Sequence, residues 1–244
     1  MNHYERLQTQ ISELRKKQIF FIGGAIKSGT TWLQLLLDAH PEVSCRGEGH
    51  FLDNLAPALK MALDQHCGVI VDKNETLFNE IGGYPLLTND DFACILETCI
   101  ALFLIRQSES KRARAIGEKT PDNSRHFAEL GVIFPTAKFV HLVRDGRDCA
   151  VSGWFHNQRL APDEALEKFA TLGEYARPLP RFGLPSLRPR RVSSSEIRIV
   201  CIKSDMRTLR RAPNGRWPVF SDSWMSKPPT PFWSTAGRRR LSKS

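Results

Sequence analysis

Residues 19–32 read IFFIGGAIKSGTTW, an apolar run that passes through a glycine-bearing turn into an amphipathic segment, Thr31–Ala39. The apolar run predicts a buried strand, and the amphipathic segment predicts a helix. At such a junction the free backbone N–H groups of the first helical turn and the positive end of the helix dipole point at one spot. The sequence therefore predicts an anion site between a strand and a helix.

The side chains of this turn suit a phosphate or a phosphate-like group. Lys27 adds a full positive charge, and Ser28, Thr30 and Thr31 add hydroxyl donors. A nucleoside-triphosphate P-loop places its lysine directly after the last glycine. Here Lys27 stands two residues before Gly29, and no lysine follows Gly29 before the helix. This order disfavours an ATPase or a GTPase, and simple capping of the helix is the alternative to anion binding.

The run Lys-Ser-Gly-Thr-Thr-Trp resembles the 5′-phosphosulfate loop of the sulfotransferases, enzymes that use 3′-phosphoadenosine-5′-phosphosulfate (PAPS) as sulfuryl donor. The resemblance implies an α/β protein with a P-loop-like three-layer fold, in which helices flank a central parallel sheet. It also implies that Ser28–Thr31 hold the 5′-phosphate and that Trp32 packs near the adenine. The donor-binding residues expected in this turn are Lys27, Ser28, Gly29, Thr30, Thr31 and Trp32.

Apolar runs and amphipathic segments alternate along the chain, which independently predicts a parallel sheet covered on both faces. Strands are expected at Ile19–Gly23, Val43–Cys45, Ala113–Ile116 and Ala137–Val143, with a last one near Ile197–Val200. In such sheets, ligands bind beyond the carboxyl ends of the strands. Four segments are therefore expected to share one neighbourhood: Gly24–Thr30, Arg46–Leu52, Glu118–Asn123 and Arg144–Ser152.

Helices are expected between these strands. Their predicted ranges are His3–Lys17, Thr31–Ala39, Asp90–Gln107 and Ser124–Leu130. The third of these has apolar residues at the spacing of a core-facing helix, namely Phe92, Ile95, Leu96, Cys99, Ile100 and Phe103. Residues 53–88 read as mixed helix and loop without clear chemistry.

A second candidate for phosphate binding lies where the strand 137–143 ends. Arg144 offers a planar fork suited to phosphate, and Ser152 on the adjoining helix can add a hydroxyl. The segment resembles the 3′-phosphate segment of sulfotransferases, in which a serine follows an arginine by eight residues. The alternative is a solvated cluster of ion pairs at a helix start.

A carboxylate, Glu48, follows the second strand. Transfer of a sulfuryl group to an alcohol or amine needs a base for the acceptor proton, and a positioned glutamate can serve. Residues 48–53 resemble the Glu-x-His-Phe-Phe-Asp stretch of the carbohydrate sulfotransferases, with Leu52 in place of the second Phe. The resemblance implies that Glu48 is the base. His50 is the rival base, and a plain loop carboxylate is the alternative to both.

A lysine follows the third strand. Residues 118–121, Glu-Lys-Thr-Pro, resemble a stretch of the same carbohydrate group in which the lysine lies near the transferring sulfuryl group. Lys119 is therefore the candidate for a second cation at the reaction centre. A Pro-marked turn that caps the next helix is the alternative, and both can hold together. His156, one helical turn after Ser152, could line the same cleft or be a surface histidine.

Together the segments predict a PAPS-dependent sulfotransferase that works by in-line transfer. Glu48 would deprotonate the acceptor, while Lys27 and Lys119 offset charge on the sulfuryl and bridging oxygens. No metal is implied, because the cations are side chains. The expected acceptor is a hydroxyl or amine of a small molecule or carbohydrate. A catalytically impaired relative that binds PAPS or 3′-phosphoadenosine-5′-phosphate (PAP), and a nucleotide kinase-like P-loop protein, remain as alternatives.

The net charge of +9 is unevenly placed along the 244 residues. Residues 177–244 carry 16 Lys plus Arg against 3 Asp plus Glu, whereas residues 1–176 carry 19 against 23. The basicity belongs to the tail, so no specific nucleic-acid binding is expected. We interpret 1–176 as a sulfotransferase-like α/β domain, and 177–244 as a basic Pro/Arg/Ser-rich tail that is disordered, truncated or out of frame.

The tail also departs from the family pattern. Sulfotransferases normally carry a basic Gly-containing loop near the C-terminus that closes over the 3′-phosphate. Asn214–Pro218 is only weakly similar to that loop.

Cysteine spacing and hydropathy bound the remaining possibilities. The six cysteines have no Cys-x-x-Cys spacing, so neither a zinc site nor a disulfide framework is indicated. No run reaches the roughly 18 apolar residues of a membrane helix, and Asn2–Lys17 is polar rather than signal-like. These features predict a cytoplasmic enzyme without membrane attachment.

Overall fold

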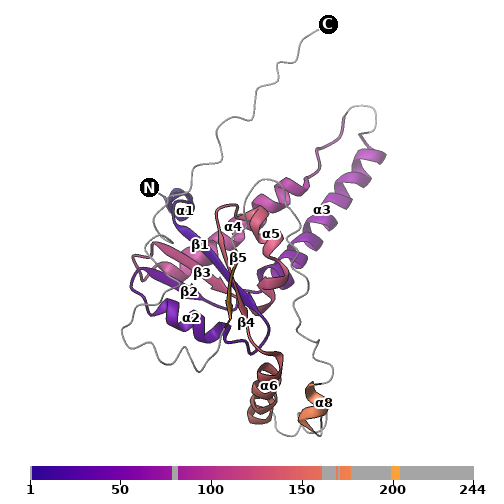
Figure 1. The fold of residues 1–244 in the computed structure, drawn as a ribbon. Coiled ribbons are helices and arrows are strands. Elements are labelled where there is room, and N and C mark those ends of the chain that lie inside the picture. The colour runs from indigo at the N-terminus through magenta and orange to yellow at the C-terminus, as the bar shows by residue number, and fades with distance from the viewer. Residues whose placement is uncertain (1, 79–81, 161–168, 170, 177–198, 204–244) are drawn as a thin grey trace.

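A parallel sheet built around β1 (Gln18–Gly24) organises the molecule (Figure 1). The computed structural model describes residues 2–78, 82–160, 169, 171–176 and 199–203. Five strands pair in the order β2-β3-β1-β4-β5, and every pair is parallel. The other strands are β2 (Val43–Arg46), β3 (Ala115–Lys119), β4 (Lys138–Val143) and β5 (Ile199–Lys203).

The central position of β1 explains its apolar sequence. Phe20, Phe21 and Ile22 are fully buried, because helices cover both faces of the strand. β1 pairs with β3 on one side and β4 on the other, so that Phe21 lies opposite Glu118 and opposite Phe139. This register brings the carboxyl ends of the three strands together, as the sequence predicts.

Helices cover the sheet on both faces and make a three-layer α/β fold, as predicted. Two separate hydrophobic clusters result: one joins the sheet to α1, α4 and α5, and the other joins it to α2. The helices are α1 (His3–Leu14), α2 (Thr30–Asp38), α3 (Ala56–Thr76), α4 (Asn89–Ser108), α5 (Phe127–Ile133), α6 (Gly146–Leu160) and α8 (Leu172–Ala176). Two short turns complete the described elements, a π-helical turn η1 (Phe51–Leu55) and a 3-10 turn η2 (Pro121–Arg125).

The helix and loop expected in residues 53–88 are present: the 21-residue helix α3 lies there, and Figure 1 shows it projecting from the body of the molecule. Two sequence expectations need correction. Phe103, expected in the core, is 58% exposed and its ring lies against that of Phe51 instead. The helix expected at Ser124–Leu130 is split into η2 and α5, because Pro121 starts a tighter turn first.

The tail is described at one element only. The strand expected near Ile197–Val200 is β5, which pairs with β4 beyond the predicted domain boundary at residue 176. The remainder of 177–244, including Asn214–Pro218, lies outside the described residues. Both the domain boundary and the nature of the tail stay predictions.

Replacing Phe21 by alanine should destabilise the fold by about 3–5 kcal/mol, because it leaves a cavity between the rings of Phe134 and Phe139. The matched control, Phe103→Ala, should cost about 1 kcal/mol, since that ring loses an aromatic pair but is more than half exposed. Urea unfolding followed by circular dichroism measures both. Equal costs for the two variants would contradict the placement of these rings.

Candidate active site

The turn between β1 and α2 is tight, with two residues at positive φ. Lys27 has φ 67° and Gly29 has φ 106°, so two residues of the turn adopt the left-handed conformation. Glycine adopts it without cost, whereas a lysine there is strained by about 1 kcal/mol or more. Ser28, whose amide donates to the carbonyl of Ala25 at 3.0 Å, is fully buried. The turn is therefore a fixed structure that leads directly into the first turn of α2.

Two glycines at the end of β1 let this turn approach its neighbours closely. A Cβ atom on Gly23 would lie 2.3 Å from the amide nitrogen of Ser124, and one on Gly24 would lie 2.4 Å from the carbonyl oxygen of Leu142. Both contacts are shorter than atoms tolerate, so only glycine allows β1 to pack here against η2 and β4. The turn is thereby brought beside the segments after β3 and β4.

Arg144, directly after β4, is joined to the turn. Its Nη1 atom donates to the carbonyl oxygen of Lys27 at 3.0 Å, and its Nε atom lies 3.8 Å from an Asp148 oxygen. The side chain is 19% exposed. Ser152 lies further along α6 and is half-buried. The structure thus ties Arg144 to the turn, while the assignment of Arg144 and Ser152 to a 3′-phosphate stays a prediction.

Charges gather around Lys27. Burial lowers the pKa of the Lys27 ammonium, the positive charge of Arg159 lowers it further, and Glu48 opposes both effects. Arg159, on α6, was not singled out from the sequence, because it follows the recognisable motif by several residues. Two cations near one turn suit an anionic ligand.

Trp32 and Thr30 serve the fold as well as the turn. Trp32 is half-buried and packs against the hydrophobic cluster beneath α2, and Thr30 is 4% exposed. The predicted place of Trp32 near an adenine stays a prediction.

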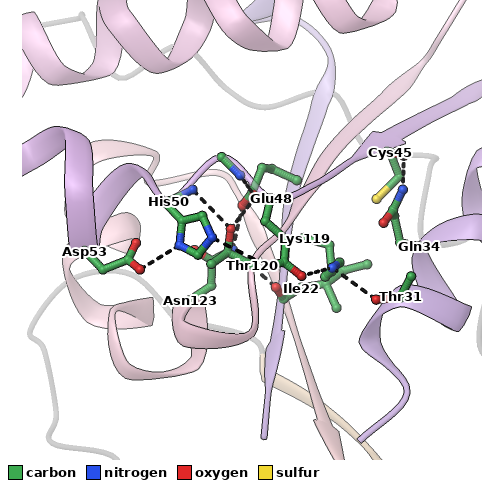
Figure 2. A network of polar contacts seen from close by, with 12 residues as sticks. Ile22, Thr31, Gln34, Cys45, Glu48, His50, Asp53, Lys119, Thr120 and Asn123 are labelled. Atoms are coloured by element: carbon green, nitrogen blue, oxygen red, sulfur yellow. Dashed lines mark hydrogen bonds and ion pairs between the residues drawn. The ribbon is translucent and has the colours of Figure 1, made fainter. Parts of the chain in front are cut away.

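Lys119 connects the turn to the candidate base. Its ammonium pairs with Oε1 of Glu48 and donates to Oγ1 of Thr31 at 3.2 Å (Figure 2). The lysine side chain is 3% exposed, whereas that of Glu48 is 37% exposed. A buried ammonium needs such partners, because an unpaired charge in the interior is costly. The structure therefore brings Thr31, Glu48 and Lys119 into one set of contacts, as the sequence predicted for their neighbourhood.

His50 lies on the other side of Glu48. Its Nδ1 atom is 2.8 Å from Oδ2 of Asp53, and its Nε2 atom is 3.5 Å from Oε2 of Glu48 (Figure 2). The hydrogen bond with Asp53 raises the pKa of His50, and the charges of Asp53 and Glu48 add to that effect. Asp53, His50 and Glu48 thus form a row that ends at the Lys119 ammonium.

A buried polar cluster that the sequence analysis gave no role lies beside this row. Glu118 is 2% exposed, and its carboxylate accepts hydrogen bonds from Gly49, Thr120 and Asn123. Burial raises the pKa of Glu118, and these hydrogen bonds oppose the rise. The signal that could have found it is strand alternation, which places Glu118 and Lys119 on opposite faces of β3.

The Sulfotransferase family model matches residues 19–179, more than half of the chain. The chain belongs to the sulfotransferase family. This match confirms the resemblance first seen in Lys27–Trp32, and it covers the turn, the candidate base, Lys119 and Arg144. Among the part of the chain that the structure describes, no group of three or more His, Cys, Asp or Glu residues is placed to hold a metal ion.

Curated relatives are similar to part of this chain. Protein-tyrosine sulfotransferase 1 of Danio rerio is 27% identical over 143 residues, which cover 59% of this chain and 37% of the relative. Protein-tyrosine sulfotransferase 2 of Gallus gallus is 29% identical over 133 residues, covering 54% and 33%. The chain thus spans about a third of the length of these relatives. Among solved structures, sulfotransferase STF9 from Mycobacterium avium has a TM-score of 0.37 and 18% identity, covering 71% of this chain and 55% of that protein.

The cytoplasmic location predicted from the sequence is wrong. The relatives are protein-tyrosine sulfotransferases, which are Golgi membrane enzymes, so similarity to them does not support that location. Within the described ranges, no helix combines the length and the apolar character needed to cross a membrane.

Replacing Asp53 by asparagine should lower the pKa of His50, because Asp53 provides the hydrogen bond and the charge that raise it. Proton NMR titration of the imidazole measures the change. Asp64→Asn is the matched control: it removes a carboxylate that pairs with Lys60 on α3 and should leave the His50 titration unchanged. An unchanged His50 titration in Asp53→Asn would disprove the pairing.

Proposed function

We propose that this protein transfers a sulfuryl group from PAPS to a hydroxyl or amine acceptor. The observation that carries the proposal is the buried Lys119 ammonium, which contacts both Thr31 of the donor turn and Glu48. A cation that joins a phosphate-binding turn to a carboxylate base stands where a sulfuryl group and an acceptor would meet. Membership of the sulfotransferase family supports the same reading.

The donor would be held by the turn and by the start of α6. Lys27, the buried Ser28 and the first turn of α2 suit the 5′-phosphosulfate end, and Arg144 with Ser152 would take the 3′-phosphate. Anionic groups at this position would offset the repulsion between Lys27 and Arg159.

Glu48 would act as the base. It would take the proton of the acceptor as the acceptor oxygen or nitrogen bonds to sulfur and the sulfur–oxygen bond to the 5′-phosphate breaks, with PAP as the leaving product. Lys27 and Lys119 would stabilise the negative charge that builds on the sulfuryl and bridging oxygens. By analogy with phosphoryl transfer, positioning and charge supply most of the catalysis, and no covalent intermediate is needed.

His50 is the less suitable base because of where it lies. Its Nδ1 atom is engaged by Asp53 and its Nε2 atom faces Glu48, whereas Lys119 and Thr31 lie beyond Glu48 (Figure 2). The sequence motifs favour a small molecule or carbohydrate as the acceptor. The names of the relatives add the phenol of protein tyrosine, so both classes belong in an acceptor screen.

A nucleotide kinase fits the described site less well. A kinase needs an acidic Mg²⁺ ligand at a strand end. The acidic residue at the end of β3, Glu118, is buried, and its oxygens accept hydrogen bonds from protein donors. A relative that binds PAP without turnover is the second alternative, and the experiments below separate it from an active enzyme.

Arg144→Ala and Lys27→Ala should each weaken PAP binding by about 10- to 100-fold, the value of one charge-assisted contact. Arg147→Ala is the matched control, because Arg147 follows in the same segment but is highly exposed and pairs with Asp145. Isothermal titration calorimetry with PAP and with ATP measures the three variants. Wild-type protein that binds neither ligand would reject the donor assignment.

Glu48→Ala should leave PAP affinity within about twofold and lower turnover by about 10²- to 10⁴-fold, the usual contribution of a general base. Transfer of radiolabelled sulfuryl to alcohol, phenol, amine and sugar acceptors measures turnover. Glu42→Ala, which removes a surface carboxylate paired with Arg114, is the control and should be fully active. Full activity of Glu48→Ala would move the base to His50, and PAP binding without transfer to any acceptor would indicate the inactive relative.

A further inference from the structure

The carboxylate of Glu118 is the most completely enclosed acidic group beside the candidate site. Its Oε1 atom accepts from the Gly49 amide at 2.8 Å and from the Thr120 hydroxyl at 2.6 Å, and its Oε2 atom accepts from the Asn123 amide at 2.7 Å. The side chain faces away from Lys119, because successive residues of a strand point to opposite faces. Glu118 therefore has no place among the reacting groups.

The partners of Glu118 lead to the loop that carries Glu48. Gly49 is the residue after Glu48, so its hydrogen bond fixes the peptide unit that links the two. The next amide, that of His50, donates at 3.3 Å to the same Thr120 hydroxyl that donates to Glu118. Two successive amides of this loop are thus held by Glu118, one directly and one through Thr120.

The same carboxylate connects the loop to the donor side of the sheet. Asn123 donates both to Glu118 and, at 3.2 Å, to the carbonyl of Ile22 near the end of β1. Thr120 and Asn123 are 1% and 3% exposed, so the cluster is closed to solvent. Hydrogen bonds to a buried charged group are stronger than neutral ones, and losing one leaves a buried polar group unsatisfied.

We propose that Glu118 is a positioning residue for the reaction: through the Gly49 amide and Thr120 it sets the place of Glu48 against Lys119 and the donor turn. This inference rests on the proposed role of Glu48 as the base. Lys119 occupies the next position in β3, so one short piece of backbone fixes the cation directly and the base through Glu118. Displacement of a base by about 1 Å can cost on the order of 100-fold in rate.

Glu118→Gln is the main test, since it keeps the shape but turns an amide donor towards the Asn123 donor. We expect kcat to fall at least about tenfold, with the PAP dissociation constant and the KM for PAPS within about twofold of wild type. Hydrogen exchange of peptides covering Gly47–Asp53, measured by mass spectrometry, should become faster. Glu97→Gln is the control. It removes a carboxylate of α4 that pairs with Arg15, and it should change neither kcat nor the hydrogen exchange of these peptides.

Coupling to the base separates positioning from a general structural effect. In the Glu48→Ala background, Glu118→Gln should cost little further turnover, because both changes remove the same contribution. An equal loss in both backgrounds would overturn the inference. So would wild-type kcat in Glu118→Gln, or a loss of PAP binding that parallels the loss of turnover.

A second variant and a second readout cover the remaining outcomes. If Glu118→Gln does not fold, Thr120→Val removes the hydroxyl that links His50 to Glu118 and should show the same kcat loss at unchanged PAP affinity. If the wild type transfers sulfuryl to no acceptor, the proposed function fails, and hydrogen exchange alone decides the inference. Faster exchange in 47–53 then supports the link between Glu118 and the loop, and unchanged exchange overturns it.

Discussion

The ammonium of Lys119 is buried at the point where three parts of the chain meet. With 3% of its side chain exposed, it has lost most of its hydration and depends on Glu48 and Thr31 for compensation. The free-energy cost of a buried unpaired charge is several kcal/mol, so loops that failed to bring these partners would destabilise the fold. Contacts with the Lys119 ammonium therefore join the start of α2 and the loop after β2 to β3.

The last two residues of β3, Glu118 and Lys119, each bind neighbouring segments, one on each face of the sheet. Lys119 points to the side covered by α2, and Glu118 points to the side on which Asn123 lies. Each is an ionisable group with almost no exposure, and each gathers partners from other segments. Because adjacent residues of one strand cannot move independently, the distances among turn, cation and base loop are set by the same backbone.

Much of the fold and part of the site could be predicted from the sequence. The strands gave clear signals because β1, for example, is buried on both faces and is therefore almost continuously apolar. Motif spacing pointed to Lys27, Glu48, Lys119 and Arg144, whose roles stay predictions. The fate of Phe103 could not be predicted, since helical spacing marks an apolar face but does not say how much of it a neighbour covers. The clusters around Glu118 and Arg159 were missed for a related reason. These residues interact with partners distant in sequence, such as Gly49 and Lys27, and only the folded chain brings those partners near.

The turn after β1 and the segment after β2 carry side chains of opposite charge. Lys27 is near Arg159, and Arg144 donates to the carbonyl of Lys27, so positive charge accumulates at the turn after β1. Glu48 and Asp53 supply negative charge in the segment after β2, where His50 lies between them. Lys119 contacts both the first turn of α2, at Thr31, and Glu48 of the loop after β2. The contacts of Lys119 therefore bring the positive charge of the turn and the negative charge of the loop after β2 next to one another.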